Sequence, residues 1–262
     1  MESTKSTVAE LRERREEMLE LLITDTDKAV TVKFLANHFD ISEMTARRDL
    51  SFLEEQGLVI RFHGGARLNE EAAQSYDNSN IYIGNIRQAI AKKAAEYIED
   101  NSSIYINSGE TALNVVDYLE ELSTIIVSNN LNIYKKKTNF RTTTILTGGE
   151  IRDPRDVLVG DLAVKSLKDI RSDYTILSCN GVSAEHGIST NNIHESIVNK
   201  TMIDNTNKLV IVVADFQKVG QSTNFTVDTL DHIDIVITDI YADKGEVSKM
   251  EELGITVVQV AV

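Results

Sequence analysis

Seven short apolar runs, separated by amphipathic stretches, follow one another along the last two thirds of this chain. Strands that are apolar along their whole length have both faces covered, and strands that alternate with helices form parallel sheets. We therefore expect an α/β domain with a doubly covered, mostly parallel sheet. The expected strands are Ile104–Asn107, Thr124–Ser128, Thr142–Leu146, Tyr174–Cys179, Leu209–Asp215, Ile233–Thr238 and Ile255–Val260. The expected helices are Ile86–Glu99, Thr111–Leu122, Asp161–Leu167, Ile193–Asp204 and Gly245–Leu253.

The first 68 residues follow a helical period instead. Leu11, Arg15, Met18, Leu19 and Leu22 share one stripe of a first helix. A second helix is expected after a Thr31 cap, and a third runs from a Ser42 cap to about Gln56. Two short strands, Leu58–Phe62 and Ala66–Leu68, then flank Gly64-Gly65. Three short helices followed by a glycine-tipped hairpin describe a winged helix-turn-helix.

A polar, aperiodic stretch separates these two patterns. Residues 69–85 contain runs such as Ser75-Tyr76-Asp77-Asn78-Ser79-Asn80 and are expected to form a linker. The expected organisation is a winged helix-turn-helix at residues 1–68, a linker at 69–85 and an α/β domain at 86–262.

Composition narrows the class of protein. The chain is 42% hydrophobic and 26% charged, as ordinary globular proteins are. No apolar run approaches the roughly 20 residues that span a bilayer, and residues 1–20 lack the apolar core of a signal peptide. Cys179 is the one cysteine, so no internal disulfide can form. These features predict a cytoplasmic protein with no membrane contact.

Net charge weighs against a nucleic-acid binder. The chain carries −14, and residues 1–68 hold 10 Lys+Arg against 13 Asp+Glu. Contact with DNA must therefore depend on a local arginine cluster rather than on a basic domain.

Such a cluster lies at the start of the third helix, which enters the major groove in a winged helix-turn-helix. Arginine suits this position because it bonds bidentately to guanine or pairs with phosphate. The hairpin supplies further groups for the backbone or minor groove. The candidates are Ser42, Met44, Thr45, Arg47 and Arg48 on the helix, and Arg61, His63 and Arg67 on the hairpin. Periodicity alone leaves open a small helical interaction domain with a solvated charged face.

The residues themselves are more specific. Ser42-Glu43-Met44-Thr45-Ala46-Arg47-Arg48-Asp49-Leu50, followed by Arg61-Phe62-His63-Gly64-Gly65-Ala66, closely resembles the DNA-binding domain of the DeoR family of bacterial regulators. The match runs from Arg15 to Ala66 without a gap, and Ala46 stands where the family more often has isoleucine or valine. This resemblance implies operator binding by Thr45, Arg47 and Arg48, assisted by the wing.

In the second domain, a glycine-containing turn joins a strand to a helix at Asn107-Ser108-Gly109-Glu110-Thr111. Backbone N–H groups at a helix N-terminus, together with two hydroxyls, are suited to bind an anion. Turns of this kind are also common where no ligand binds. Neither a GxGxxG fingerprint nor a Walker A motif is present, which argues against dinucleotides and nucleoside triphosphates.

The second domain also carries a series of polar residues and glycines in a fixed order: Asn107–Thr111, Ser128-Asn129-Asn130, Gly148-Gly149 with Gly160, Asn180-Gly181-Val182, Gly187 with Thr190, Glu195, and Asp215 with Lys218. This order resembles the sensor domain of the same family, and that domain looks like sugar-phosphate isomerases. The resemblance implies a phosphosugar pocket in which Ser108, Gly109 and Thr111 hold phosphate, with Arg87 and Lys218 supplying positive charge. Asn107 belongs to the same loop, and Asn129, Asn180 and Glu195 would meet sugar hydroxyls. Two residues depart from the family, which usually has Asp at position 107 and Thr at position 110; a Glu110 directed into the pocket would repel phosphate. Residues Ile151–Val159 resemble the lactose phosphotransferase repressor branch.

The remaining polar residues have simpler interpretations. Cys179, His186 and His194 match no familiar zinc spacing, and neither a metal nor a cofactor is expected. Glu195 on a helix is ordinarily a solvated carboxylate, so only the resemblance makes it a ligand contact. Lys135-Lys136-Lys137 is expected to be a solvated helix end favoured by the helix dipole.

These observations predict a repressor of a carbohydrate operon, released from its operator DNA by a phosphorylated sugar, and a homo-oligomer (dimer or tetramer) rather than an enzyme. Two alternatives remain. A sugar-phosphate isomerase would use Glu195 and Lys218, but it has no need of residues 11–68. A protein-interaction module would leave the ordered polar residues of the second domain without a role.

Overall fold

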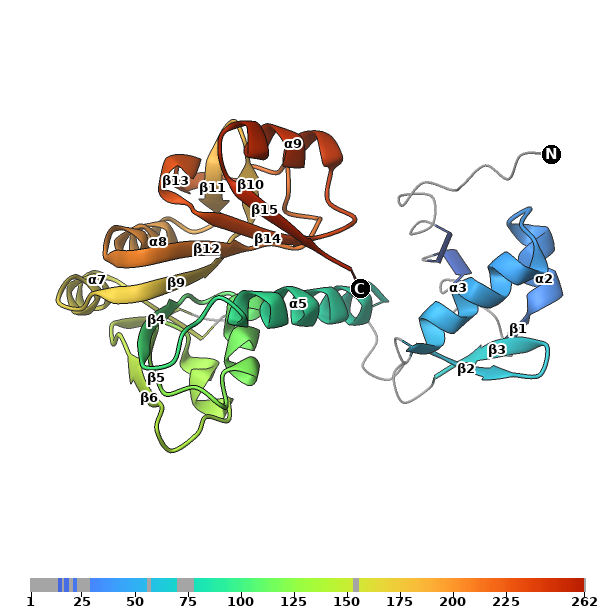
Figure 1. The fold of residues 1–262 in the computed structure, drawn as a ribbon, viewed down its shortest axis with the longest axis horizontal. Helices are drawn as coiled ribbons and strands as arrows, with labels where there is room; N and C mark the ends of the chain where they lie inside the picture. The colour runs from blue at the N-terminus through green and yellow to red at the C-terminus, as the bar shows by residue number, and fades with distance from the viewer. Residues whose placement is uncertain are drawn as a thin grey trace. The chain divides into compact units, whose positions relative to one another are not determined.

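A computed structural model describes residues 14, 15, 17, 18, 21, 22, 29–55, 58–69, 78–152 and 156–261. The chain divides into two compact units, Met1–Asn85 and Ile86–Val262, each with its own core. Figure 1 labels most helices and strands of the two units, which we describe one at a time.

The described part of the N-terminal unit includes the helices α2 and α3 and a three-stranded antiparallel sheet. Its elements are β1 (Ala29–Thr31), α2 (Val32–His38), α3 (Glu43–Glu55), β2 (Val59–Phe62) and β3 (Gly65–Leu68). The described residues of the expected first helix are helical, and Met18 and Leu22 are fully buried. Leu11 and Leu19 lie outside the described residues.

Side-chain caps start both helices where the sequence predicts them. The Thr31 hydroxyl accepts from Phe34 N at 3.1 Å, and the Ser42 hydroxyl accepts from Thr45 N at 3.1 Å. Each cap satisfies a backbone N–H that has no partner inside the helix. The buried faces of the two helices meet around Leu35, Ala46, Leu50 and Leu53, which places the opposite face of α3 outward.

Strand β1 was not expected from the sequence. It pairs with β3, which also pairs with β2, so the predicted hairpin is part of a three-stranded sheet. A Cβ on Gly65 would come within 2.2 Å of the Val30 carbonyl oxygen, so β1 can approach only because residue 65 has no side chain. Three residues are too few for their period to be recognised in the sequence.

The second unit is built on a seven-stranded parallel sheet in the order β15-β14-β12-β9-β4-β5-β6. All seven expected strands are confirmed, with ends shifted by up to three residues. Their bounds are β4 Ser102–Ile106, β5 Thr124–Ser128, β6 Thr143–Leu146, β9 Ser172–Ser178, β12 Thr206–Val213, β14 Ile235–Asp239 and β15 Thr256–Val260.

Helices cover this sheet on both sides. Figure 1 shows α5 along one side and α8 and α9 along the other. From β4 the chain proceeds toward β6, whereas from β9 it proceeds toward β15, so the direction of winding reverses between β4 and β9. The helical elements are α5 Asn78–Ala95, α6 Glu110–Asn114, α7 Asp161–Lys168, α8 Ile193–Asp204 and α9 Lys244–Glu252, with 3₁₀ turns η1 Val115–Tyr118, η2 Leu131–Lys135 and η3 Leu230–His232.

One helix begins earlier than expected. Residues 78–85, expected to belong to the linker, form the first part of α5. The period of the helix continues upstream through the polar residues, because Ile83 is buried one turn before the fully buried Ile86. The expected helix Thr111–Leu122 is instead a short α6 that continues as η1.

Five short strands outside the main sheet were also missed. A hairpin joins β7 (Glu150–Arg152) to β8 (Val157–Val159), and β10 (Gly181–Ser183), β11 (Gly187–Thr190) and β13 (Phe225–Asp228) form a small antiparallel sheet. Each has three or four residues, and β10 and β11 contain glycine and serine rather than an apolar run.

Candidate functional sites

A polar pocket of about 690 Å³ opens at the carboxyl ends of the central strands in the second unit. Its walls come from the turns after β4, β5, β9 and β12, and from α5 and α8. In open α/β sheets, ligands bind where the winding direction reverses, as it does here between β4 and β9. The volume falls within the range of small-molecule sites.

The floor of the pocket is the turn expected to hold an anion, which internal hydrogen bonds keep in place. The buried Asn107 amide donates to Ser178 O at 2.8 Å and to Asn199 Oδ1 at 3.2 Å, while its oxygen accepts from Ser178 N at 3.0 Å and Gly109 N at 3.2 Å. Asn107 therefore positions the turn, with its hydrogen-bonding groups directed to protein partners.

Gly109 is required by close packing. A Cβ there would lie 2.1 Å from the Ser178 Cβ. The Ser178 hydroxyl accepts from Ala112 N at 3.0 Å, which ties β9 to the first turn of α6. The Thr111 hydroxyl is buried with no hydrogen-bond partner among the described residues. A buried hydroxyl without a hydrogen-bond partner costs desolvation free energy. A ligand that bonded to the Thr111 hydroxyl would recover that cost.

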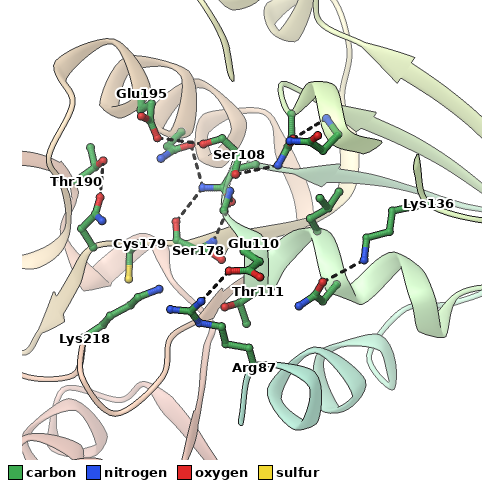
Figure 2. A pocket seen from close by; sticks show the side chains of 18 of the residues that line it. Arg87, Ser108, Glu110, Thr111, Lys136, Ser178, Cys179, Thr190, Glu195 and Lys218 are labelled. Atoms are coloured by element: carbon green, nitrogen blue, oxygen red, sulfur yellow. Dashed lines mark hydrogen bonds and ion pairs between the residues drawn. The ribbon is translucent and has the colours of Figure 1, made fainter. Parts of the chain in front are cut away.

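Arg87 links α5 to the pocket (Figure 2). Its Nη1 lies 2.7 Å from Glu110 Oε2, and its Nε lies 3.1 Å from Asp215 Oδ2. Lys218 Nζ lies 3.7 Å from the same Asp215 oxygen, whereas Asp215 Oδ1 is buried with no hydrogen-bond partner among the described residues. The two expected cations thus converge on one buried carboxylate. Glu110 faces Arg87 although its side chain is 69% exposed.

The other expected sugar contacts lie on the opposite wall. Glu195, buried in the first turn of α8, accepts from the Ser108 hydroxyl at 3.0 Å. The Asn180 side-chain oxygen accepts from the Thr190 hydroxyl at 3.0 Å. All four residues line the pocket, so the structure brings together groups that come from three separate segments.

Asn129 and Asn130 have different positions. Asn129 is fully buried, donates to Leu158 O at 3.1 Å and does not line the pocket. Asn130 does line it and donates to Ser108 O at 2.9 Å. Sequence reasoning chose the first of two adjacent asparagines, and the pattern of residues holds no signal that separates them.

Two lysines of the pocket wall were assigned to a solvated helix end from the sequence. Lys135 and Lys136, at the end of η2, both line the pocket, whereas Lys137 does not. Lys136 Nζ donates to Asn114 Oδ1 at 3.0 Å and pairs with Asp117 at 2.5 Å. No spacing rule could have identified them, because their place depends on how η2 folds over α6.

Cys179 also lines the pocket, and its surroundings favour the neutral thiol over the thiolate. Burial raises its pKa to about 12, although nearby Lys218 acts in the opposite direction. His186 is exposed beside Glu185, and His194 Nε2 contacts Arg152 Nη2 at 3.1 Å. Among the described residues, no group of His, Cys, Asp and Glu is arranged to hold a metal ion.

The N-terminal unit presents its candidates on α3 and the wing. Met44 is 63% exposed, and Arg48 is exposed without an ion pair to any described residue. Arg47 lies 3.5 Å from Glu43, an exposed pair that contributes little to stability. The Thr45 and Ser42 hydroxyls bond to each other at 2.9 Å. The first turns of α3 therefore offer two arginines and a methionine to solvent.

The residues of the wing, which is the hairpin of β2 and β3, differ in how firmly they are held. Arg61 Nη1 donates to the Ser51 hydroxyl at 2.6 Å and lies 3.7 Å from Glu54, so this arginine is held against α3. His63 and Arg67 are exposed, the first at the turn where Gly64 has φ +96°.

A buried ion cluster supports α3 from within. Asp49 is 1% exposed, and its two oxygens accept from Arg14 Nε and Arg15 Nε, each at 2.9 Å. The Arg15 guanidinium also lies 3.9 Å from the centre of the Phe52 ring. These contacts join the first helix to α3. Sequence reasoning placed Arg15 on the apolar stripe but did not identify its partner.

Within the described residues, no helix combines the length and the apolar character needed to cross a membrane.

Two family profiles match the chain. The DeoR-like helix-turn-helix domain covers residues 14–72, and the DeoR C terminal sensor domain covers residues 84–240. The transcriptional regulator GolR of Listeria innocua is 32% identical over 94% of this chain and 97% of its own length. The glycerol-3-phosphate regulon repressor of Escherichia coli is 31% identical over 80% of this chain and 84% of its own. The lactose phosphotransferase system repressor of Staphylococcus epidermidis is 28% identical over 80% and 86%, respectively.

Proposed function

The chain belongs to the DeoR family of transcriptional regulators, and we propose that it represses a carbohydrate-utilisation operon and leaves its operator when a phosphorylated sugar binds the pocket. The relatives that match it over most of their length are named as regulators and not as enzymes. The isomerase alternative therefore lacks support.

The observation that carries this proposal is the position of Arg87. It lies on α5, the helix by which the chain passes from the helix-turn-helix into the sensor unit, and it reaches the pocket to pair with Asp215 and Glu110. A phosphate bound at Ser108–Thr111 competes for the same guanidinium, because arginine forms charge-assisted hydrogen bonds with phosphate as it does with carboxylates.

Release then follows from a change in the partners of Arg87. A ligand can lower operator affinity only if it binds the DNA-free conformation more tightly, and such coupling is typically about 1–3 kcal/mol. When Arg87 exchanges a carboxylate partner for phosphate, α5 shifts, and the paired DNA-binding units no longer match the spacing of their half-sites.

Variants of Lys218 test the proposal. In a fluorescence-anisotropy assay on the chain's own promoter, Lys218→Ala should keep operator affinity and lose release by the effective sugar phosphate. Lys249→Ala is the matched control, because Lys249 is exposed and lies outside this pocket. The unphosphorylated sugar should be inert. Normal release of Lys218→Ala, or equal release by free sugar, would contradict the pocket assignment.

We also propose that the sensor unit holds a homo-oligomer together, as two-fold operators require. A fragment for this test must begin at Asn78, since a fragment starting at Ile86 would cut α5. Residues 78–262 should sediment as a dimer or tetramer. A monomer at micromolar concentration would refute this assignment.

A further inference from the structure

The pocket has cationic side chains on two sides. Figure 2 shows Lys218 on one side of Ser108 and Glu110 and Lys136 on the other. Arg87 and Lys218 come from α5 and the turn after β12, whereas Lys135 and Lys136 come from η2 and the residue after it. The phosphate proposed at Ser108–Thr111 accounts for the first pair only.

The segment that carries the second pair is held against the anion-binding turn. The Asn130 side-chain oxygen accepts from Asn132 N at 2.9 Å and so caps η2. The same side chain donates to Ser108 O at 2.9 Å. Lys135 and Lys136 therefore have a defined place relative to the floor of the pocket.

Their partners leave this side of the pocket positively charged. Lys135 Nζ donates to Asn132 Oδ1 at 2.6 Å, and Lys136 Nζ donates to Asn114 Oδ1 at 3.0 Å; both acceptors are neutral amides that line the pocket. Within the described part of the chain, Asp117 is the one carboxylate paired with either amine. Two ammonium groups thus face one carboxylate.

The other side is already balanced. Arg87 and Lys218 face the two carboxylates Asp215 and Glu110. The electrostatic free energy of binding an anion is most favourable beside cations whose charge is not already neutralised. This free energy is larger in a recess of the protein than in bulk water, because the effective dielectric constant is lower there. The side formed by Lys135 and Lys136 therefore has the larger excess of positive charge and is the more favourable place for an anion. The resemblance to the family assigns no role to these two lysines.

We propose that Lys135 and Lys136 form a second anion subsite and that the effector carries two anionic groups, as a sugar bisphosphate does. This inference rests on the proposed function, because it assigns a second contact to the same effector. One anionic group binds at Ser108–Thr111 with Arg87 and Lys218, and the other binds between η2 and α6. The sugar spans the asparagine-rich middle of the pocket.

Inorganic phosphate is the probe, because it reports anion sites whatever the sugar is. The thermal stability of the full chain is measured against phosphate concentration at constant ionic strength. Each site adds RT ln(1 + [L]/Kd), so the limiting slope against the logarithm of phosphate concentration counts sites. The wild type should have the slope of two sites. Lys136→Gln should weaken one site about tenfold or more, and Lys218→Gln should weaken the other.

Two further variants separate a subsite from general electrostatics. Lys137→Gln removes the same charge from an exposed neighbour that does not line the pocket, and it should keep both sites. Lys136→Arg keeps the charge and should keep most of the affinity that Lys136→Gln loses.

The outcomes distinguish this inference from the proposed function. A one-site slope in the wild type, whose onset moves to higher phosphate concentration in Lys218→Gln and stays unchanged in Lys136→Gln, overturns the second subsite and leaves the phosphosugar pocket in place. Equal losses in Lys136→Gln and Lys137→Gln also overturn it. Absence of any phosphate stabilisation overturns both proposals.

Discussion

The two units present their arginines and lysines in opposite ways. In the sensor pocket, Arg87 pairs with two carboxylates, and Lys136 pairs with Asp117 and an amide. On α3, Arg48 is exposed without an ion pair to any described residue, and Arg47 has one loose partner at 3.5 Å. The pocket therefore holds its charged groups in place, whereas α3 leaves them to solvent.

Under the proposed function, this difference fits the sizes of the two partners. A small ligand has little surface, so the protein must fix its contacts in advance to limit the entropy lost on binding. Operator DNA offers a continuous array of phosphates and base edges, and flexible exposed arginines can find acceptors on it. The following predictions test this contrast, beginning with the largest effect.

Asp49 is the exception in the N-terminal unit, because it is a charged group held before any partner arrives. Asp49→Ala leaves the 9%-exposed Arg14 without its carboxylate. Removing one partner of a buried ion pair costs about 3–5 kcal/mol. Urea unfolding of the full chain should show this loss in the transition of the N-terminal unit. Glu43→Ala, which breaks only an exposed pair, should cost under about 1 kcal/mol. Equal stability of the two variants would show that the Asp49 cluster contributes little.

Gly109 tests the fixed floor of the pocket. In Gly109→Ala the new Cβ overlaps Ser178 and should destabilise the sensor unit by about 1–3 kcal/mol. Release by sugar phosphate should be lost while operator affinity is kept. Gly84→Ala is the control, because its Cβ meets nothing within 4 Å and alanine favours a helix by about 0.5–1 kcal/mol. If Gly109→Ala still responds normally, the floor of the pocket adapts rather than being fixed.

Arg48 tests the opposite case, an exposed side chain that matters only with DNA. Arg48→Ala should weaken specific operator binding by about 1–3 kcal/mol and leave unfolding unchanged. Arg61→Ala should lose less affinity, since Arg61 is already bonded to Ser51. Fluorescence anisotropy over a range of salt concentrations measures both effects. Loss of stability in Arg48→Ala, with affinity retained, would reverse the assignment.

Glu110 gives the smallest expected change. Glu110→Gln removes the negative charge beside Arg87, so phosphate no longer competes with a carboxylate for that guanidinium. Phosphate affinity should rise about threefold, roughly 0.6 kcal/mol. The pair is partly solvated, which limits the gain. Calorimetric titration with the effective sugar phosphate measures it, and Glu120→Gln, an acidic residue that does not line the pocket, is the control. Lower affinity in Glu110→Gln would mean that Glu110 contacts the ligand directly.

Interactions between residues close in the sequence determine some features of this fold, and these features could be predicted from the sequence. The caps at Thr31 and Ser42 were found from the sequence because a cap acts within three residues. The strands of the main sheet were found because each contains a short apolar run, although the edge strand β6 is exposed rather than covered on both faces. The turn 107–111 was located for the same reason, since it lies between a strand and a helix. The start of α5 was missed because its polar residues masked the buried Ile83.

The sequence by itself therefore determined the two capped helices of the N-terminal unit, the seven strands of the main sheet and the turn that forms the floor of the pocket. Only the tertiary structure decided that Asn130 rather than Asn129 lines the pocket, that Lys136 faces inward, and that Arg61 lies against α3. Each of these depends on contacts between different elements, and in the same pocket Arg87 and Asp215 meet although they are 128 positions apart in the chain. The position of a residue within the helical or strand period indicates which face of its own element the side chain occupies. The packing of other elements decides which residues that face contacts.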